Sequence, residues 1–353
     1  MSSASPIATE PIAYLSRFLL SPETPPFLSP EEFKACLPLA HRHHVVMRWL
    51  RGLSGTESGQ NAAVAEWTQS ALAEEETRIV RALGFLEAIC DELSRRGCEV
   101  TVIKSLDHWP DLGSDLDLYS NAPSRHVIRA MKEGFKAELA PRSWGDRLAG
   151  KWNFIVPGLA EAVEVHVGRL GQTGEHVSWA AGIPSRAVRV QRAHCAFRAA
   201  APEDRLMIST LQRMYRHFYF RLCDILDSAQ LIESVVVDFA RLRRYSQEAG
   251  IWSGVATYLV IVSDYTEAYG RESLALPPSV RMASAFGGEQ LSFKRGFLRV
   301  PIIPHSVALY TREWGTLARR GELPETLRLS LLPYLAAAAA LGEKLTGRDK
   351  GIW

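Results

Sequence analysis

Two aspartates at alternate positions, Asp115 and Asp117, are the residues of this chain best suited to chemistry. On a β-strand, residues two apart point to the same face, so the two carboxylates lie together while Leu116 and Leu118 point to the opposite face. Neighbouring carboxylates repel each other unless a cation lies between them. Mg²⁺ is commonly held by one or two carboxylates together with the phosphates of a substrate. The pair therefore predicts a divalent-metal site for phosphoryl-transfer chemistry.

A polar strand end precedes this acidic pair. The segment Glu99–Lys104 is predicted to be a short strand, and the next residue is Ser105. Nine residues separate Ser105 from Asp115, which is enough for a short helical turn between two strands. The chain thus places Lys104 and Ser105 beside the acidic pair, in the layout of a phosphoryl-transfer site.

This stretch resembles the signature of the nucleotidyltransferase superfamily, the enzymes with a polymerase-beta-like fold. The signature is an apolar residue, Gly, Gly or Ser, nine to thirteen residues, and then Asp, apolar, Asp or Glu, apolar. Here the matching residues are Ile103, Lys104 and Ser105, then nine residues, and then Asp115 to Leu118. The departure is Lys104, where most members carry glycine, a residue that lets backbone approach phosphate closely.

A lysine before Ser105 is similar to one bacterial branch, whose members are described only as uncharacterised nucleotidyltransferases. The segments Glu164–His166 and Pro202–Asp204 are also similar to that branch, and the similarity spans about residues 37–260. Ser114 before the first aspartate resembles the Ser-Asp of aminoglycoside nucleotidyltransferases. The last ~90 residues resemble no family that we can name.

The resemblance implies a third carboxylate on a neighbouring strand, which binds metal or takes the proton of the attacking hydroxyl. Glu164 is the natural choice, because in a strand over Ala162–Val167 the valines face the core and Glu164 and His166 share the other face. Asp115, Asp117 and Glu164 are thus the expected catalytic and metal-binding residues, with Mg²⁺, or Mn²⁺ in its place, as cofactor. The alternative is an ordinary amphipathic strand with its polar residues in solvent.

Lys104, Ser105 and Ser114 are the expected phosphate-binding residues, and His166 and Arg221 are expected on the substrate side. Lys104 could instead be a surface lysine at a strand end, and Ser114 could only cap a turn. Arg221 and Asp224 are one turn apart on a predicted helix, where an intrahelical ion pair is the alternative. Three glycines after the Glu164 strand suggest a flexible loop over the site: Gly168, Gly171 and Gly174.

The predicted fold class is α+β, a small mixed-sheet nucleotidyltransferase core flanked by helical regions. The boundaries are residues 1–97 for an N-terminal helical region, 98–200 for the core and 201–353 for a C-terminal helical domain. Ser29 and Pro30 predict a helix start. One continuous apolar helical stripe is expected from Leu206 to Ile232. The other expected helices and strands are Ala62–Arg96, Ser124–Gly134, Asp238–Glu248, Trp252–Tyr269 and Leu323–Lys344, and Asp115–Tyr119, Trp152–Val156, Ala162–Val167 and Ala187–Gln191.

Composition narrows the class of protein. The 353 residues are 47% hydrophobic and 23% charged, with a formal net charge of +2, which gives no reason to expect a polyanionic partner. Five scattered cysteines without CxxC spacing favour a reducing cytoplasm over zinc or disulfides. The N-terminus does not have the pattern of a signal peptide. The apolar run Leu331–Gly342 is too short to span a membrane and is expected to be a buried helix.

The chemistry expected from these observations is transfer of NMP from an NTP such as ATP to a hydroxyl, with release of pyrophosphate. A small molecule or a protein is favoured as the acceptor over nucleic acid, and no membrane partner is expected. One alternative is a non-catalytic nucleotide-binding scaffold, which the missing glycine at Lys104 supports. Another is a toxin-like nucleotidyltransferase that acts on tRNA. A cluster of three histidines (His41, His43 and His44) is expected on a solvated helix face rather than at a metal.

Overall fold

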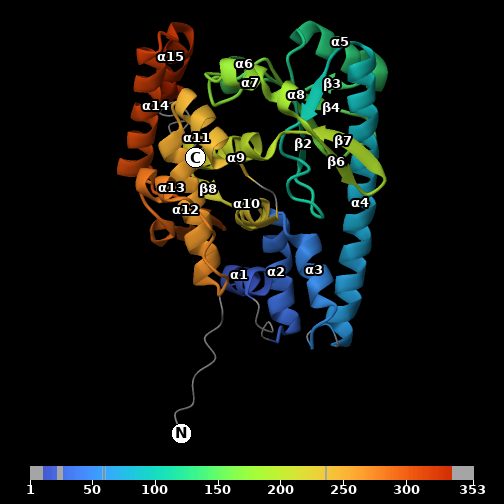
Figure 1. Cartoon of the computed structure of the whole chain (residues 1–353). Helices are drawn as coiled ribbons and strands as arrows, with labels where there is room; N and C mark the ends of the chain where they lie inside the picture. The colour runs from blue at the N-terminus through green and yellow to red at the C-terminus, as the bar shows by residue number, and fades with distance from the viewer. Residues whose placement is uncertain (1–10, 22–26, 58, 60, 235–236, 336–353) are drawn as a thin grey trace.

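A computed structural model describes residues 11–21, 27–57, 59, 61–234 and 237–335, and it has a mixed α+β architecture (Figure 1). Its main sheet has seven strands in the order β3-β4-β5-β2-β1-β7-β6. The strands are β1 Val100–Val102, β2 Asp115–Ser120, β3 Glu138–Leu139, β4 Lys151–Ile155, β5 Ala162–Val167, β6 Val188–Arg192 and β7 Cys195–Ala199.

The order of pairing determines which side chains become neighbours. β2 runs parallel to β5 with Asp117 opposite Glu164, and antiparallel to β1 with Leu118 opposite Val102. β5 is antiparallel to β4 with His166 opposite Lys151. The expected strands Asp115–Tyr119 and Ala162–Val167 are therefore confirmed to within one residue. The short edge strand β3 and strand β7 were not expected.

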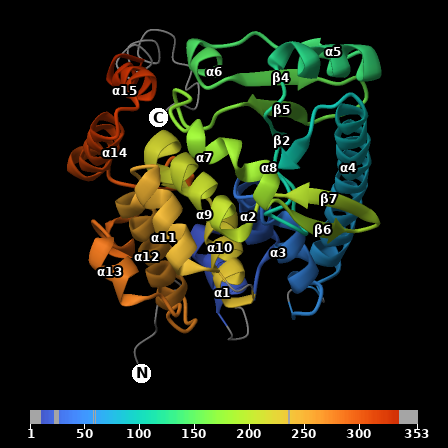
Figure 2. The ribbon, with the colours of Figure 1, turned by 45° about the horizontal axis from the view of Figure 1, so that its top comes forward.

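Among the described residues, four α-helices precede the sheet: α1 Pro11–Leu20, α2 Pro30–Arg42, α3 Val46–Leu53 and α4 Ala62–Arg95. Ser29 accepts a hydrogen bond from the Glu32 N–H, and the Glu32 side chain accepts one from the Ser29 N–H. This reciprocal capping box confirms the predicted start of α2. In Figures 1 and 2 the sheet lies between the long helix α4 and the helices of the second half of the chain.

Short helices lie between the strands of the main sheet: α5 Ser124–Phe135, α6 Trp144–Leu148, α7 Ser178–Ala181 and α8 Ile183–Arg186. The predicted helix Ser124–Gly134 is confirmed as α5. The later helices are α9 Pro202–Thr210, α10 Leu222–Ser234, α11 Phe239–Glu248, α12 Trp252–Ala268, α13 Pro278–Ala283, α14 Val307–Arg319 and α15 Leu323–Ser330, with a 3₁₀-helix at Gly288–Gln290 and a π-helix at Ile302–Ser306.

The predicted continuous helical stripe from Leu206 to Ile232 is wrong. After α9 the chain forms a π-helix, Leu211–His217, and then takes a left-handed φ of 53° at Phe218. A left-handed residue cannot continue a right-handed helix, so the chain leaves the helix and forms the two-residue strand β8, Tyr219–Phe220. β8 joins β9 Ser292–Lys294 and β10 Phe297–Arg299 in a second sheet of order β8-β10-β9.

The C-terminal prediction is tested only in part. The helix expected from Leu323 begins there as α15, but residues 336–353 lie outside the described part of the chain. Leu331 and Tyr334 are 44% and 76% exposed, so the described start of the run expected to be buried is not buried. Among the described residues, no helix has both the length and the apolar composition needed to cross a membrane.

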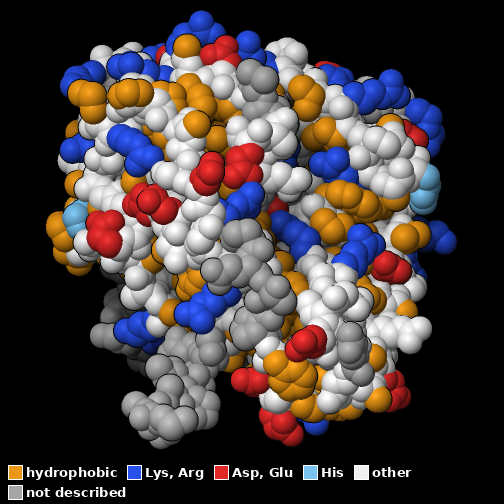
Figure 3. Space-filling view, turned by 60° about the horizontal axis from the view of Figure 1, so that its bottom comes forward, with side chains coloured by type: hydrophobic (Ala, Val, Ile, Leu, Met, Phe, Trp, Pro, Cys, Tyr) orange, Lys and Arg blue, Asp and Glu red, His pale blue; other side chains and the backbone are white. Residues whose placement is uncertain are grey.

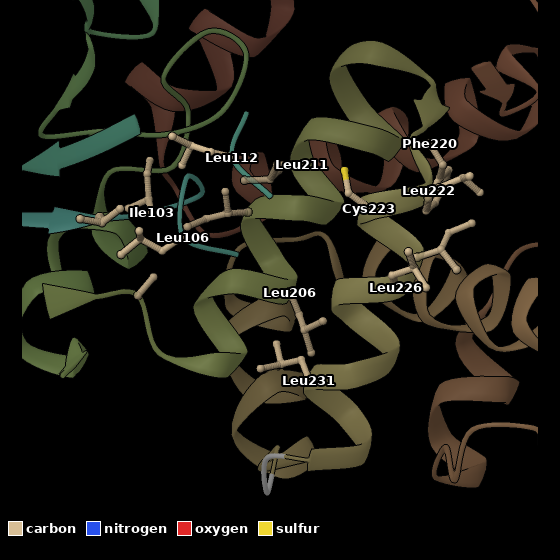
Figure 4. Close-up of a cluster of buried hydrophobic side chains, with 14 of the residues drawn as sticks. Ile103, Leu106, Leu112, Leu206, Leu211, Phe220, Leu222, Cys223, Leu226 and Leu231 are labelled. Carbon is tan, nitrogen blue, oxygen red and sulfur yellow. The ribbon is translucent and has the colours of Figure 1, made fainter. Parts of the chain in front are cut away.

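A hydrophobic core joins the turn after β1 to the second half of the chain (Figure 4). Ile103, Leu106 and Leu112, which surround the Lys104-Ser105 corner, belong to the same buried cluster as Leu206 of α9 and Leu222 of α10. Burying such side chains stabilises a fold by about 1.5–3 kcal/mol each. The corner is therefore held in place from both the sheet and the helices.

Candidate functional site

Two predicted acidic residues, Asp117 and Glu164, lie side by side on adjacent strands. The parallel register of β2 and β5 places them directly opposite each other. Their residues are only 8% and 9% exposed, whereas Asp115 is exposed at the start of β2. His166 is 5% exposed, so the alternative in which the polar residues of β5 lie in solvent is wrong.

Two lysines neutralise this acidic pair. The Lys104 Nζ lies 2.5 Å from Asp117 Oδ1 and 3.6 Å from Glu164 Oε1, between the two carboxylates. Lys151, the first residue of β4, is buried and forms an ion pair with Glu164 Oε2. The alternative of Lys104 as a surface lysine is therefore wrong. The position between the two acids, where the sequence predicts a cation, is taken by an ammonium group.

The surroundings of Asp117 and Glu164 shift the pKa values of the two carboxyl groups in opposite directions. Burial raises the pKa of Asp117 to about 7, although Lys104 works in the opposite direction. Burial also opposes ionisation of Glu164, but Lys104, His166 and Lys151 together hold its pKa well below the usual value. Glu164 therefore carries the firmly held negative charge of the pair.

His166 contacts Glu164 as a neutral ring and holds this carboxylate in its orientation. Its Nε2 lies 2.7 Å from Glu164 Oε1. Burial lowers the pKa of His166 to about 4, so the ring is neutral near pH 7 and its Nε2–H donates to the carboxylate. Its Nδ1 is buried and has no hydrogen-bond partner among the described residues.

The two predicted phosphate-binding serines lie at the start of β2. The Ser105 Oγ accepts a hydrogen bond from the Asp117 N–H at 2.7 Å and donates to the Asp115 carbonyl at 3.2 Å. Its hydroxyl therefore fixes the backbone that carries both aspartates. Ser114 Oγ donates to the Asp115 carboxylate at 3.4 Å.

A cavity of about 180 Å³ opens in front of these residues. One wall comes from the sheet and carries the acids and lysines, and the other comes from the π-helix and the segment after it. The lining residues are His44, Lys104, Ser105, His108, Gly113, Ser114, Asp115, Asp117, Lys151, Glu164, Gln212, Arg213, Arg216, His217 and Arg221. Carboxylates from the sheet and guanidinium groups from the π-helix and the segment after it thus line the same cavity, a charge pattern suited to a phosphate-bearing ligand with a divalent cation.

Arg221 lines this cavity, and its role on the substrate side stays a prediction. The expected alternative, an ion pair between Arg221 and Asp224 within one helix, is wrong. The Asp224 carboxylate lies 2.7 Å from Arg213 Nε and accepts the backbone N–H of Arg221 at 2.6 Å. The Arg221 side chain is left facing the cavity, and its Nε is buried without a hydrogen-bond partner among the described residues.

The three-glycine segment borders a smaller cavity of about 40 Å³ next to His166. Gly168, Gly171 and Gly174 have φ values of 70°, 99° and 72°, which favour glycine. The segment is fastened at its far end, because Glu175 accepts N–H groups of Gln172 and Thr173.

A buried ion pair also connects the three-glycine segment to α14. In this pair His176 Nε2 lies 3.1 Å from Glu313 Oε1. Burial raises the pKa of Glu313 to about 7, although His176 works in the opposite direction. Burial opposes charging of His176, yet Glu313 and Glu175 raise the pKa of that ring. Both folded-state pKa values thus lie above the ordinary ones.

This pair makes stability depend on pH. A raised folded pKa gives stability that is complete below the unfolded pKa and is lost as the pH rises through the folded value. We expect the free energy of unfolding to fall by about 3 kcal/mol between about pH 4.5 and pH 7 because of Glu313. Urea unfolding of wild type and Glu313→Gln across this window measures the difference. An equal slope in both proteins would contradict the assignment.

Several cavity residues were not found from the sequence. Lys151 opens a strand of mixed polarity, and only its pairing opposite His166 brings it to Glu164. Arg213 and Arg216 lie within an apolar helical stripe. Charged residues inside such a stripe are the feature of the sequence that could have indicated a functional role for them. His108 lies in the predicted turn, with its Nδ1 2.5 Å from Asp227 of α10.

The prediction of a solvated face for the three histidines of α2 and its end is also wrong in part. His43 is fully buried, and its ring lies 3.0 Å from the Gly296 carbonyl and accepts the Leu222 N–H at 2.9 Å. His44 lines the cavity and stacks on His108. Only His41 is exposed.

The five cysteines, Cys36, Cys90, Cys98, Cys195 and Cys223, are all free in the structure. Comparisons of the chain with protein-family models, with curated proteins and with solved structures found no match.

Proposed function

We propose that this protein is a metal-dependent nucleotidyltransferase that moves NMP from an NTP to a hydroxyl group and releases pyrophosphate. The observation that carries the proposal is the cavity between Asp117 and Glu164 on one wall and Arg216 and Arg221 on the other. In the reaction the acceptor oxygen bonds to the α-phosphorus, the bond from that phosphorus to the β-phosphate oxygen breaks, and the hydroxyl proton is released.

The acidic side chains fit a hard divalent cation. Asp115, Asp117 and Glu164 offer only carboxylate oxygens, the ligands preferred by Mg²⁺. Ligand atoms of Asp117, Glu164 and His166 lie within 4.8 Å of one another. When bound there, Mg²⁺ would neutralise the triphosphate and lower the pKa of the acceptor hydroxyl. Lys104 would have to move from between the carboxylates toward the phosphates.

The chain's own residues would supply position and charge. Arg216 and Arg221 face the acids across the cavity and could bind the phosphates of the donor. Ser105 fixes the backbone of both aspartates, and His166 fixes Glu164. Positioning and electrostatics supply most of the rate in phosphoryl transfer, because the protein has little covalent work to do.

The test is a titration of ATP, GTP, CTP and UTP into the protein, each with and without Mg²⁺. Wild type is expected to bind at least one nucleotide in a metal-dependent way, and the double variant Asp115→Asn/Asp117→Asn is expected to lose that dependence. Binding that ignores both the metal and the aspartates would overturn the proposal.

A replacement of Lys104 tests its position between the acids. Lys104→Met removes the ammonium that competes with a metal ion, so the affinity for Mn²⁺ without nucleotide is expected to rise about tenfold or more. Nucleotide affinity is expected to fall, because one phosphate-neutralising charge is gone. Calorimetric titration of Mn²⁺ measures the first effect, with the exposed Lys132→Met as control. Unchanged Mn²⁺ affinity would show that the Lys104 ammonium does not compete with a metal ion for the two carboxylates.

A second function, a nucleotide-binding scaffold without catalysis, is favoured by one observation. Lys104 and Lys151 already neutralise both buried acids without a metal. A scaffold is expected to bind nucleotide with the same affinity in EDTA, whereas the enzyme is not. The toxin-like alternative predicts growth arrest on expression, abolished by Asp117→Asn.

A further inference from the structure

Three segments of this chain carry cations and no acidic residue. They are residues 40–44, 211–223 and 292–299, and together they contain Arg42, Arg213, Arg216, Arg221, Lys294, Arg295 and Arg299. The formal net charge of the whole chain is only +2, so the remaining residues compensate for them. On the face shown in Figure 3, basic and acidic side chains are interspersed. The cations of the three segments are therefore not balanced by acids within the same segments.

The fold brings the three segments together. Strand β10 pairs with β8, with Arg299 opposite Tyr219, and with β9, with Phe297 opposite Lys294. His43 joins the first segment to the others, because its ring contacts the Gly296 carbonyl and accepts the Leu222 N–H. Residues more than 250 positions apart thus form one surface.

One face of the small sheet carries an aromatic pair surrounded by guanidinium groups. The rings of Tyr219 and Phe297 stack with centroids 4.2 Å apart. Arg299 lies 5.2 Å from the centroid of Tyr219, and Arg221 lies within 6.0 Å of both rings. Arg42 lies 5.9 Å from the centroid of Phe297. Guanidinium groups this close together repel each other unless anions lie among them.

We name five of these cations the basic face: Arg42, Arg216, Arg221, Lys294 and Arg299. In the described part of the chain, none of their side chains forms an ion pair with a carboxylate. Arg221 also keeps a buried Nε without a hydrogen-bond partner there. The nearby Asp224 is committed to Arg213 and to the backbone of Arg221. The basic face therefore lacks an anionic partner within the described chain.

The basic face is continuous with the candidate active site. Arg216 and Arg221 line the 180 Å³ cavity beside Asp117, whereas Arg42, Lys294 and Arg299 lie outside it on α2 and the small sheet. A donor triphosphate in the cavity accounts for the inner cations only. The outer cations need a ligand whose negative charges continue beyond the cavity.

We infer that the basic face binds single-stranded nucleic acid and leads its terminal hydroxyl into the cavity. This inference rests on the proposed function, for which it names the acceptor. Spaced cations are the arrangement by which proteins follow the backbone of a single strand, since guanidinium groups contact phosphates. Phe297 is partly exposed and offers a ring on which a base can stack, whereas Tyr219 is buried. The terminal oxygen would bond to the α-phosphorus of the NTP as pyrophosphate leaves and the hydroxyl proton passes to solvent. The sequence had favoured a small-molecule or protein acceptor from net charge alone, which does not show how charges are distributed.

The experiment measures binding of a fluorescein-labelled 12-nucleotide single-stranded RNA by fluorescence anisotropy from 50 to 250 mM KCl. Five phosphate contacts predict a slope of log K against log salt of about −3.5 for wild type. The variant Arg42→Ala/Lys294→Ala/Arg299→Ala is expected to have a slope of about −1.4 and weaker binding at every salt concentration. The matched control Arg125→Ala/Lys132→Ala/Arg189→Ala removes three exposed cations elsewhere and is expected to keep the wild-type slope.

A lysine-substituted form, Arg42→Lys/Arg299→Lys, keeps the charge and is expected to keep the slope, which separates lost charge from lost folding. Wild-type failure to bind RNA at 50 mM KCl, or equal slopes in wild type and the triple-alanine variant, would overturn the inference. Binding to anionic lipid vesicles but not to RNA would also overturn it.

Metal-dependent NTP binding, measured on the same proteins, keeps this inference separate from the proposed function. The outer cations do not line the cavity, so the triple-alanine variant is expected to bind NTP like wild type. RNA binding by the basic face without metal-dependent NTP binding would contradict the proposed nucleotidyltransferase activity but support nucleic-acid binding by this surface. Metal-dependent NTP binding without RNA binding would support the proposed activity and contradict nucleic-acid binding by the basic face.

Discussion

Asp117→Asn is expected to lower NMP transfer about 10³-fold or more, because it removes one of the carboxylates proposed to bind the metal. Asn keeps the size of the side chain and can still accept a hydrogen bond from Lys104. The backbone N–H of residue 117 still donates to Ser105, so β2 keeps its start. Activity is measured as label transferred from an α-³²P-NTP, and folding as the thermal midpoint.

The control for this prediction is Asp91→Asn, which changes an exposed acid on α4. We expect wild-type transfer from that protein. If Asp117→Asn retained more than about a tenth of wild-type turnover while Asp91→Asn retained all of it, Asp117 would not belong to the reaction centre.

Glu164→Gln is expected to destabilise the fold by about 3–5 kcal/mol, because it leaves buried positive charge without a partner. Lys151 is 5% exposed, and Glu164 is its shortest ion-pair contact. Lys104 would keep only Asp117. Glu99→Gln is the control, since the Glu99–Arg198 pair is about half exposed and its loss is expected to cost less than about 1 kcal/mol. Urea unfolding at pH 7 gives both values.

The cause can be isolated with a second substitution. Replacing Lys151 by Met in the Glu164→Gln background removes the unpaired cation and is expected to recover most of the lost stability. No recovery would mean that Glu164 stabilises the fold through His166 or through packing instead of through charge.

The elements that carry the acids could be predicted from sequence because their patterns are local. Alternation over Asp115–Leu118 and over Ala162–Val167 identified β2 and β5 and placed Glu164 and His166 together on one face. The pairing of β2 with β5 could not be read from the alternation itself. It came only with the family resemblance, which implied a third acid on a neighbouring strand.

Other features depend on contacts between distant residues. The helical stripe after Pro202 looked continuous because its apolar spacing persists through Phe218, whose left-handed backbone breaks it. The break forms because Tyr219 and Phe220 pair with β10, nearly 80 residues later. Neither β9 nor β10 carries a strong strand pattern in three residues. The end of α2 at Arg42 was not predicted, because the apolar stripe of Leu37, Leu39, His43, Val46 and Leu50 continues past it. The burial of His43 depends on Gly296, a distant residue.

The distribution of charge over the surface also could not be predicted from the sequence. A net charge of +2 described the whole chain correctly and suggested no polyanionic partner. The three acid-free segments are separated by long stretches of sequence, and only the small sheet and His43 bring them together. The gathering of positive charge on one surface could therefore be found only from the three-dimensional structure.

The most direct test of nucleotidyl transfer is to follow pyrophosphate release and α-phosphate labelling together. The protein would be incubated with Mg²⁺, each α-³²P-labelled NTP in turn and a bacterial cell extract, which supplies nucleic acid, protein and small-molecule acceptors. Nucleotidyl transfer predicts labelled acceptor and an equal amount of pyrophosphate with at least one NTP, both lost in Asp117→Asn. Pyrophosphate release and labelling no greater than in Asp117→Asn, with all four NTPs, would contradict it.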